Sequence, residues 1–244
     1  GMLYAEVRFA PQSHLRKGLT QEEVVKAAVL GMQEALAGSF FQAKLILCCM
    51  RGTDNRKENK ETIRVAGSYL GRGVAAIDLA GAEALYPTAD FEELFVYARN
   101  LGIPFTIHAG EADGPESIEA ALSFGAARIG HGVRAGEDEK LLVRLRERRI
   151  PLEMCPTSNV QTKAVESFCE HPVLDYLRFG LRVTLNTDNM TVSDTTIEGE
   201  YGRLARELGM TKEEHRQLLF HAVDAAFLTS EERGRMKDVI GRIV

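Results

Sequence analysis

The sequence lacks the features that mark membrane and nucleic-acid-binding proteins. Its longest apolar runs are of strand length, far short of the roughly 20 residues that a membrane-spanning helix needs. The N-terminus has neither the basic region nor the apolar core of a secretory signal. The basic residues form no long block, and the densest run, "RLRERR" at 144–149, is typical of the solvated end of a helix. We therefore expect no membrane partner and no nucleic-acid partner.

The cysteines show no Cys-x-x-Cys spacing, so the sequence indicates neither a zinc ribbon nor a disulfide framework. Reduced thiols fit a cytoplasmic protein best. The net charge of −5 and the hydrophobic fraction of 45% are those of an ordinary soluble globular protein. A chain of 244 residues is within the size range of one α/β barrel.

Short runs rich in valine, isoleucine and leucine alternate with amphipathic stretches along the whole chain. The predicted strands are 3–10, 43–50, 74–80, 104–109, 127–132, 150–155 and 182–188. Several are almost continuously apolar, as expected of parallel strands that are covered on both faces. Thr20 and Glu23 fit a capping box at the start of a helix. Three further helices are predicted after the last strand, near 195–208, 212–228 and 230–241.

Repeats of strand and helix form either an open doubly wound sheet or a barrel. Polar side chains decide between them, because one lies at or next to the C-terminal end of almost every predicted strand; they are Arg8, Asp78, His108, His131, Cys155 and Asp188. In a barrel these ends converge on one mouth. A doubly wound sheet would carry a glycine-rich phosphate turn early in the chain, and the sequence has none. We predict a TIM-type (βα)8 barrel.

Only seven strands are found, and the chain begins directly inside one of them. We therefore expect residues 1–244 to form a single barrel domain that lacks its first strand–helix unit and carries extra C-terminal helices. The strands at 3–10 and 182–188 would then have unpaired edges. We expect a homo-oligomer that associates through these edges.

Two histidines and two carboxylates at the predicted mouth indicate metal-assisted hydrolysis. His108 ends a strand, and Gly110 allows the sharp turn that brings Glu111 back over the mouth. An imidazole can bind a metal, and a carboxyl group shielded from water can act as a general acid. His131 lies between two glycines, and Asp188 follows a mostly apolar strand, where a metal ion would be a suitable partner. Taken singly, His108 is equally compatible with a purely structural role, whereas for His131 the role of a ligand or water contact is favoured over a structural one.

The motifs "EVRFAP", "AIDLAGAE", "HAGE", "GHGVR", "CPTSNVQT" and "NTDN" occur in this order over nearly the whole chain. In them the sequence resembles the adenosine deaminase family of the amidohydrolase superfamily, and most of all its bacterial adenosine enzymes. The resemblance implies a zinc cofactor with His108 and Asp188 as ligands. It further implies that Glu111 protonates purine N1 and that His131 orients the attacking water and helps to deprotonate it.

The resemblance also implies two contacts with a purine nucleoside. The backbone N–H of Gly81 would donate to purine N3, although a simple turn glycine is as good an interpretation. Asn189 would face N7, which only accepts hydrogen bonds, and its amide can donate directly. His14, His171, His215 and His221 are interpreted as structural, with His171 as a helix cap.

The family pattern breaks at the zinc site. The family's first strand carries a His-x-His pair that supplies two zinc ligands, and this chain has no His-x-His. A catalytic zinc ion normally has about three protein ligands and a water, so His108 and Asp188 alone should bind zinc weakly. The expected activity, by resemblance, is the zinc-dependent deamination of adenosine, and of deoxyadenosine, by water. A catalytically incomplete barrel that keeps a purine pocket and an adenine-type deaminase are the alternatives.

Overall fold

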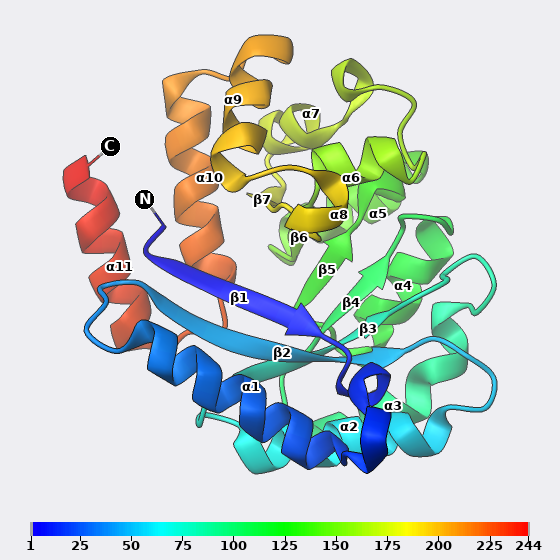
Figure 1. Cartoon of the computed structure of the whole chain (residues 1–244). Helices are drawn as coiled ribbons and strands as arrows, with labels where there is room; N and C mark the ends of the chain where they lie inside the picture. Colours follow the sequence, from blue (N-terminus) through cyan, green and yellow to red (C-terminus); the bar gives the residue numbers. More distant parts are fainter. Residues whose placement is uncertain (1, 244) are drawn as a thin grey trace. The chain divides into compact units, whose positions relative to one another are not determined.

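The computed structural model describes residues 2–243 (Figure 1). This part of the chain divides after Ile107 into two compact units. Within residues 2–243, seven strands pair as two parallel sheets and not as one closed ring. The α/β fold with seven strands and extra C-terminal helices is thus confirmed, and the single barrel domain stays a prediction.

All the predicted strands form, most of them a little shorter than expected. They are β1 (Tyr4–Phe9), β2 (Gln42–Met50), β3 (Val74–Ala80), β4 (Thr106–Ala109), β5 (Arg128–His131), β6 (Pro151–Met154) and β7 (Arg182–Leu185). The later strands end one to three residues before the predicted boundary, because the residues there turn away toward a loop. His131, the last residue of β5, has a φ of 59°, which ends extended pairing at that point.

The first unit is a sheet in the order β1-β2-β3 with helices on one of its sides. Its α-helices are α1 (Gln21–Leu36), α2 (Arg56–Tyr69) and α3 (Glu92–Asn100), and its 3-10 helices are Pro11–His14, Arg16–Gly18 and Thr88–Phe91. Figure 1 shows α1, α2 and α3 on the same side of the sheet. The middle strand, β2, is buried from Leu45 to Cys49, which explains its continuous run of apolar residues.

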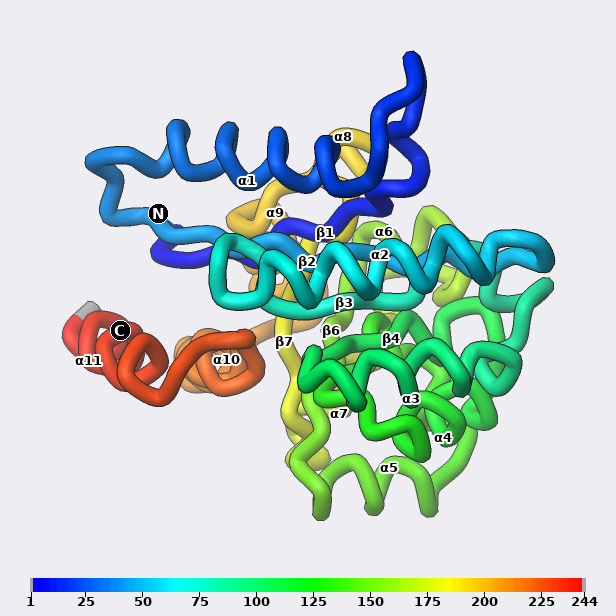
Figure 2. The backbone as a smooth tube through the Cα atoms, turned by 90° about the horizontal axis from the view of Figure 1, so that it is seen from below, coloured from blue at the N-terminus to red at the C-terminus, as the bar shows by residue number. Residues whose placement is uncertain are grey.

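The second unit is built on a sheet in the order β4-β5-β6-β7. Its α-helices are α4 (Pro115–Phe124), α5 (Glu139–Glu147), α6 (Pro156–Gln161), α7 (Val173–Phe179), α8 (Met190–Ser193), α9 (Ile197–Glu207), α10 (Lys212–Ala225) and α11 (Ser230–Ile243), and its 3-10 helices are Val133–Glu137 and Phe168–Glu170. Helix α10 packs against β7, and α11 packs against α10 (Figure 2).

Several helices begin and end at local sequence signals. Thr20 and Glu23 form the capping box at the start of α1. Pro115 opens α4, and Gly125 ends it with a φ of 89°, a conformation that glycine adopts without steric cost. Gly180 ends α7 in the same way. These local signals position the helices before any tertiary contact is considered.

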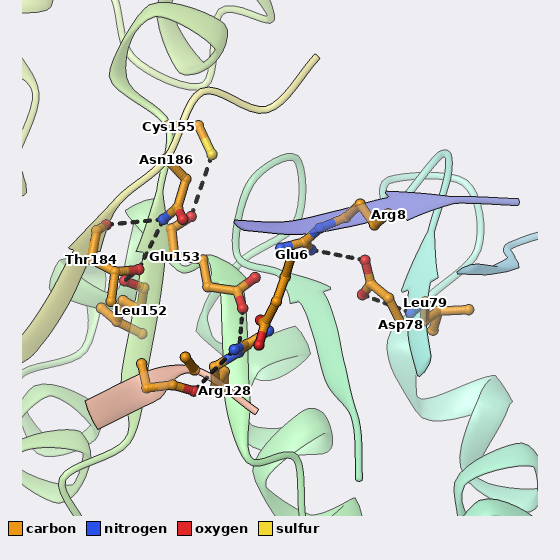
Figure 3. Close-up of polar contacts among 12 residues, drawn as sticks. Glu6, Arg8, Asp78, Leu79, Arg128, Leu152, Glu153, Cys155, Thr184 and Asn186 are labelled. Atoms are coloured by element: carbon orange, nitrogen blue, oxygen red, sulfur yellow. Dashed lines mark hydrogen bonds and ion pairs between the residues drawn. The ribbon is translucent and has the colours of Figure 1, made fainter. Parts of the chain in front are cut away.

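In the first unit, Arg8 and Asp78 turn toward each other from β1 and β3 (Figure 3). The Arg8 Nη1 atom lies 2.9 Å from Asp78 Oδ2, and the Asp78 side chain is fully buried. A buried carboxylate needs such a partner. Both residues were expected at the mouth because they are polar and end strands, and the structure shows that they form an ion pair with each other.

In the second unit, Arg128 on β5 forms an ion pair with Glu153 on β6 (Figure 3). The Nε atom of Arg128 lies 2.5 Å from Glu153 Oε1, and both side chains are about 5% exposed. The guanidinium also donates to the carbonyl of Ala225, 2.9 Å away, and lies over the ring of Phe227. This one side chain therefore connects two strands to the C-terminal end of α10.

Between residues 2 and 243 there is no helix with both the length and the apolar composition needed to span a bilayer.

The Arg128–Glu153 pair gives a stability prediction. The variant Glu153→Leu removes the carboxylate that faces Arg128 inside the second unit and should lower the free energy of unfolding by about 3–5 kcal/mol. The double variant R128M/E153L should lose less than the sum of the two single variants, because it leaves neither charge buried. Urea unfolding measures all three.

The exposed pair between Glu61 and Arg64 on α2 serves as a control. Glu61→Gln should change stability by less than about 1 kcal/mol, because exposed ion pairs contribute little. Strictly additive effects of R128M and E153L would contradict the prediction.

Candidate active site

The candidate site lies in the second unit, at the C-terminal ends of its strands. His108 is in β4, His131 ends β5, helix α6 follows β6, and Asp188 follows β7. Parallel strands bring these ends to one edge of the sheet. His108, Glu111 and His131 lie together at this edge, and Asp188 is joined to helix α6 through Ser158.

Glu111 and His131 are brought into contact. Oε2 of Glu111 lies 3.5 Å from Nε2 of His131, and the His131 side chain is almost fully buried. The rings of His108 and His131 are stacked at a tilt, with their centroids 4.9 Å apart. Gly110, with a φ of 70°, makes the turn after β4, and a Cβ atom there would lie 2.5 Å from Ile118 Cδ1. The turn that places Glu111 thus requires glycine.

Glycine is also favoured at position 130, next to His131. A Cβ atom on Gly130 would lie 3.1 Å from the Cα of His108 and 3.2 Å from its Nδ1. The absence of a side chain at this residue therefore relieves a tight contact with His108. The sequence shows only that His131 lies between two glycines, and the structure shows that the first of them makes room for His108.

Helix α6, in the "CPTSNVQT" segment, holds the site together. Ser158 donates to Oδ2 of Asp188 at 2.7 Å. Asn159 donates to Oε1 of Glu111 at 3.3 Å, and Thr162 donates to the same oxygen at 3.0 Å. No role was predicted for these three residues from the sequence, in which the segment served only as a motif of the family resemblance. The sequence feature that could have indicated their roles is the position of this segment directly after a strand that ends at the site.

His131 and Asp188 are strained. Their φ angles are 59° and 54°, in the left-handed region that non-glycine residues seldom occupy. Strain of this kind costs on the order of 1–3 kcal/mol per residue and is concentrated at functional sites. His131 and Asp188, both predicted as site residues at strand ends, are therefore held in conformations that the surrounding structure must enforce.

The two residues expected to contact a purine have local structural roles. Asn189 is exposed and is the N-cap of α8, where its Oδ1 accepts from the backbone N–H of Val192 at 3.0 Å. Gly81 belongs to the first unit and follows β3 with a φ of 111°. That angle alone accounts for a glycine there. A contact of either residue with a purine stays a prediction.

His171, expected to be only a helix cap, reaches the site through Asn159. Its Nδ1 accepts from the backbone N–H of Val173 at the start of α7, as a cap would. Its Nε2 lies 3.2 Å from Oδ1 of Asn159. Burial lowers the pKa of His171 to about 3, and the nearby His131 adds to the shift. The ring is therefore neutral at ordinary pH.

The donor set does not fit a zinc centre with three protein ligands. Across the described residues, no group of three or more histidine, cysteine, aspartate or glutamate side chains could hold a metal ion. The two predicted ligands, His108 and Asp188, would supply two donors, and a catalytic zinc site uses about three. The two ligands stay a prediction.

The family model described as "Adenosine deaminase" matches residues 1–243. The chain belongs to the adenosine deaminase family. It is 53% identical over 237 residues to an adenosine deaminase of Haemophilus ducreyi, a match that covers 96% of this chain and 69% of that relative.

Solved structures agree with this family fold. An adenine deaminase from Arthrobacter aurescens matches with a TM-score of 0.89 at 26% identity, over 98% of this chain and 73% of that one. Arabidopsis ADAL in complex with IMP matches with a TM-score of 0.86 at 27% identity, over 98% and 72%. A cog1816 amidohydrolase from Burkhoderia ambifaria with bound Zn has a TM-score of 0.91, over 98% and 67%, and at 22% identity shows the fold alone.

The neutral, buried His171 predicts a dependence of stability on pH. Between pH 6.5 and about 3 the unfolded chain binds a proton that the folded chain does not. The free energy of unfolding should therefore fall as the pH drops below about 6.5, with a contribution from His171 of up to about 1.4 kcal/mol per pH unit.

Urea unfolding at pH 7, 6 and 5 measures this slope. In the variant His171→Gln, which keeps a donor near Asn159 but cannot titrate in this range, stability should fall less steeply with decreasing pH. Equal slopes for the two proteins would show that His171 does not stay neutral in the folded state.

Proposed function

We propose that this protein deaminates adenosine, and also deoxyadenosine, with water to give inosine, or deoxyinosine, and ammonia. The observation that carries the proposal is the contact between Glu111 and His131 at the strand ends, supported through helix α6. The 53% identity to a named adenosine deaminase supports the choice of substrate.

Glu111 is the proposed proton donor to purine N1. Its Oε1 accepts from both Asn159 and Thr162, so Oε2 is the oxygen on which a transferable proton would be carried. Protonation of N1 withdraws electrons from C6 and makes that carbon more open to attack by water. The carbonyl of inosine forms as the C6–N bond breaks, and the leaving amino group takes up a proton to depart as ammonia.

His131 is the proposed partner of the attacking water. Its ring is fixed next to Glu111, so a water held against Nε2 would lie beside the carboxyl group that acts on the purine. Holding reactants in such an arrangement contributes to the rate by lowering the entropic cost of the reaction. Asp188, held by Ser158, is proposed as the acceptor for a hydrogen bond from this water. His108 and Asp188 are the proposed donors toward zinc.

The nucleoside contacts are proposed to follow the family pattern, with Gly81 at purine N3 and Asn189 at N7. Asn189 uses its side-chain oxygen to cap α8, which leaves the amide N–H groups as the atoms suited to N7, an acceptor. A cytoplasmic location is proposed as well, because the spacing of the cysteines indicates no disulfide framework.

The second candidate is an adenine deaminase, since one of the matching structures carries that name. Its identity of 26% is half that of the adenosine deaminase from Haemophilus ducreyi, so adenosine is favoured. The two candidates differ in whether the ribose is needed for turnover.

Ultraviolet absorbance of purified protein mixed with adenosine, deoxyadenosine or adenine, with and without added zinc, tests the proposal. We expect turnover of both nucleosides and little turnover of adenine. Glu111→Gln should lower kcat at least about 100-fold, because the amide cannot donate a carboxyl proton.

Glu116→Gln is the matched control, since Glu116 is an exposed carboxylate on α4 of the same unit, and it should keep parental turnover. Turnover of adenine alone would favour the second candidate. Absence of turnover under all conditions would identify a catalytically incomplete barrel.

We also propose that the protein self-associates through β1. This strand stands at the end of its sheet, and Val7 at its centre is 52% exposed, a combination that favours pairing with another chain. Val7→Lys should shift sedimentation velocity profiles toward the monomer. Val96→Lys, at an exposed valine on α3, is the control and should not. A parent protein that stays monomeric at high concentration would contradict the proposal.

A further inference from the structure

The side-chain amide of Asn159 is fully buried and contacts four groups. Its Oδ1 lies 3.3 Å from the backbone nitrogen of Cys155 and 3.2 Å from Nε2 of His171. Its Nδ2 lies 3.3 Å from Oε1 of Glu111 and 3.0 Å from Nδ1 of His131. Buried networks of this kind fix hydrogen-bond directions when every member is satisfied.

The partners themselves decide which way the amide points. A backbone N–H can only donate, so the atom of Asn159 that faces Cys155 must be the oxygen. The carboxylate of Glu111 accepts hydrogen bonds, so the atom that faces it must be the nitrogen. These two contacts give the same orientation of the amide independently of either histidine.

His171 is consistent with this orientation. Its Nδ1 accepts from the backbone N–H of Val173, which places the ring proton on Nε2. Nε2–H then donates to the oxygen of Asn159. Burial keeps the ring neutral by lowering its pKa to about 3, so a second proton does not disturb the arrangement at ordinary pH.

The tautomer of His131 is determined in the same way, by the hydrogen-bond partner of its ring. The amide nitrogen of Asn159 carries only donors, so Nδ1 of His131 must accept and carries no proton. In the neutral ring the proton is then on Nε2, the atom that lies 3.5 Å from Oε2 of Glu111. Each hydrogen bond thus determines the direction of the next, from Val173 through His171 and Asn159 to His131.

We propose that Asn159 is a positioning residue that holds His131 in its Nε2–H tautomer and holds Glu111 beside it. In this tautomer His131 presents a donor to the site. It orients the attacking water by donating to its oxygen, and it does not accept the water's proton at Nε2. The inference rests on the proposed function for the use of His131, but the tautomer itself is independent of turnover.

The tautomer can be measured by long-range ¹H–¹⁵N spectroscopy of the full chain labelled at histidine nitrogens, with signals assigned by single His→Gln variants. We expect an Nε2–H pattern for both His131 and His171. In Asn159→Asp the carboxylate only accepts, so His131 should change to a state with a proton on Nδ1. With adenosine, kcat of this variant should fall at least about tenfold, with a smaller change in KM.

Asn159→Ala is the second variant, since a buried carboxylate can prevent folding. It removes the donor to Nδ1, and His131 should then show a mixture of tautomers. Asn100→Asp, an exposed amide at the end of α3, controls for the added charge and should leave the His131 signals and kcat unchanged.

An Nδ1–H pattern for His131 in the parent protein would overturn the inference, as would unchanged His131 signals in folded Asn159→Asp. The spectra separate this inference from the proposed function. A parent protein with no turnover but with the Nε2–H pattern, lost in the two Asn159 variants, would refute the activity and support the positioning role.

Discussion

The hydrogen bonds of the Asn159 amide join three segments that are far apart in the chain. They connect the end of β6 at Cys155, the loop after β4 at Glu111 and the end of β5 at His131. Each strand is fixed by its own sheet pairing, but that pairing does not determine which way a terminal side chain points. The buried amide supplies this direction, because its donor and acceptor ends cannot be exchanged without losing hydrogen bonds.

The strands and most of the polar residues of the site could be predicted from the sequence. Continuous apolar runs predicted all the strands of the described chain, and the polar residues at their ends included His108 and His131 of the observed cluster. Glu111 was predicted from the turn at Gly110 that follows His108. The same rule also selected Arg8 and Asp78, which neutralise each other. A polar residue at a strand end has the same sequence pattern whether it meets a substrate or an ion-pair partner.

The supporting residues could not be predicted from local patterns. Ser158, Asn159 and Thr162 act through partners that are 30 to 51 residues away in the chain, and neither hydrophobic periodicity nor capping rules contain such information. His171 shows the same limit, since its predicted cap is present, while its second contact depends on the tertiary structure. The prediction of a metal site is limited in another way, because no group of three or more donor side chains that could hold a metal ion is found among the described residues.

The ion pair of Arg128 has a consequence for how the second unit opens. Its guanidinium is hydrogen-bonded to the last residue of α10, where a positive charge also favours the helix dipole. Separation of α10 from the sheet would leave this charge without its carbonyl and its aromatic neighbour Phe227. Helix α10 and strands β5 and β6 should therefore exchange their slowest amide hydrogens in one cooperative opening event, and not as a helix that frays from a stable sheet.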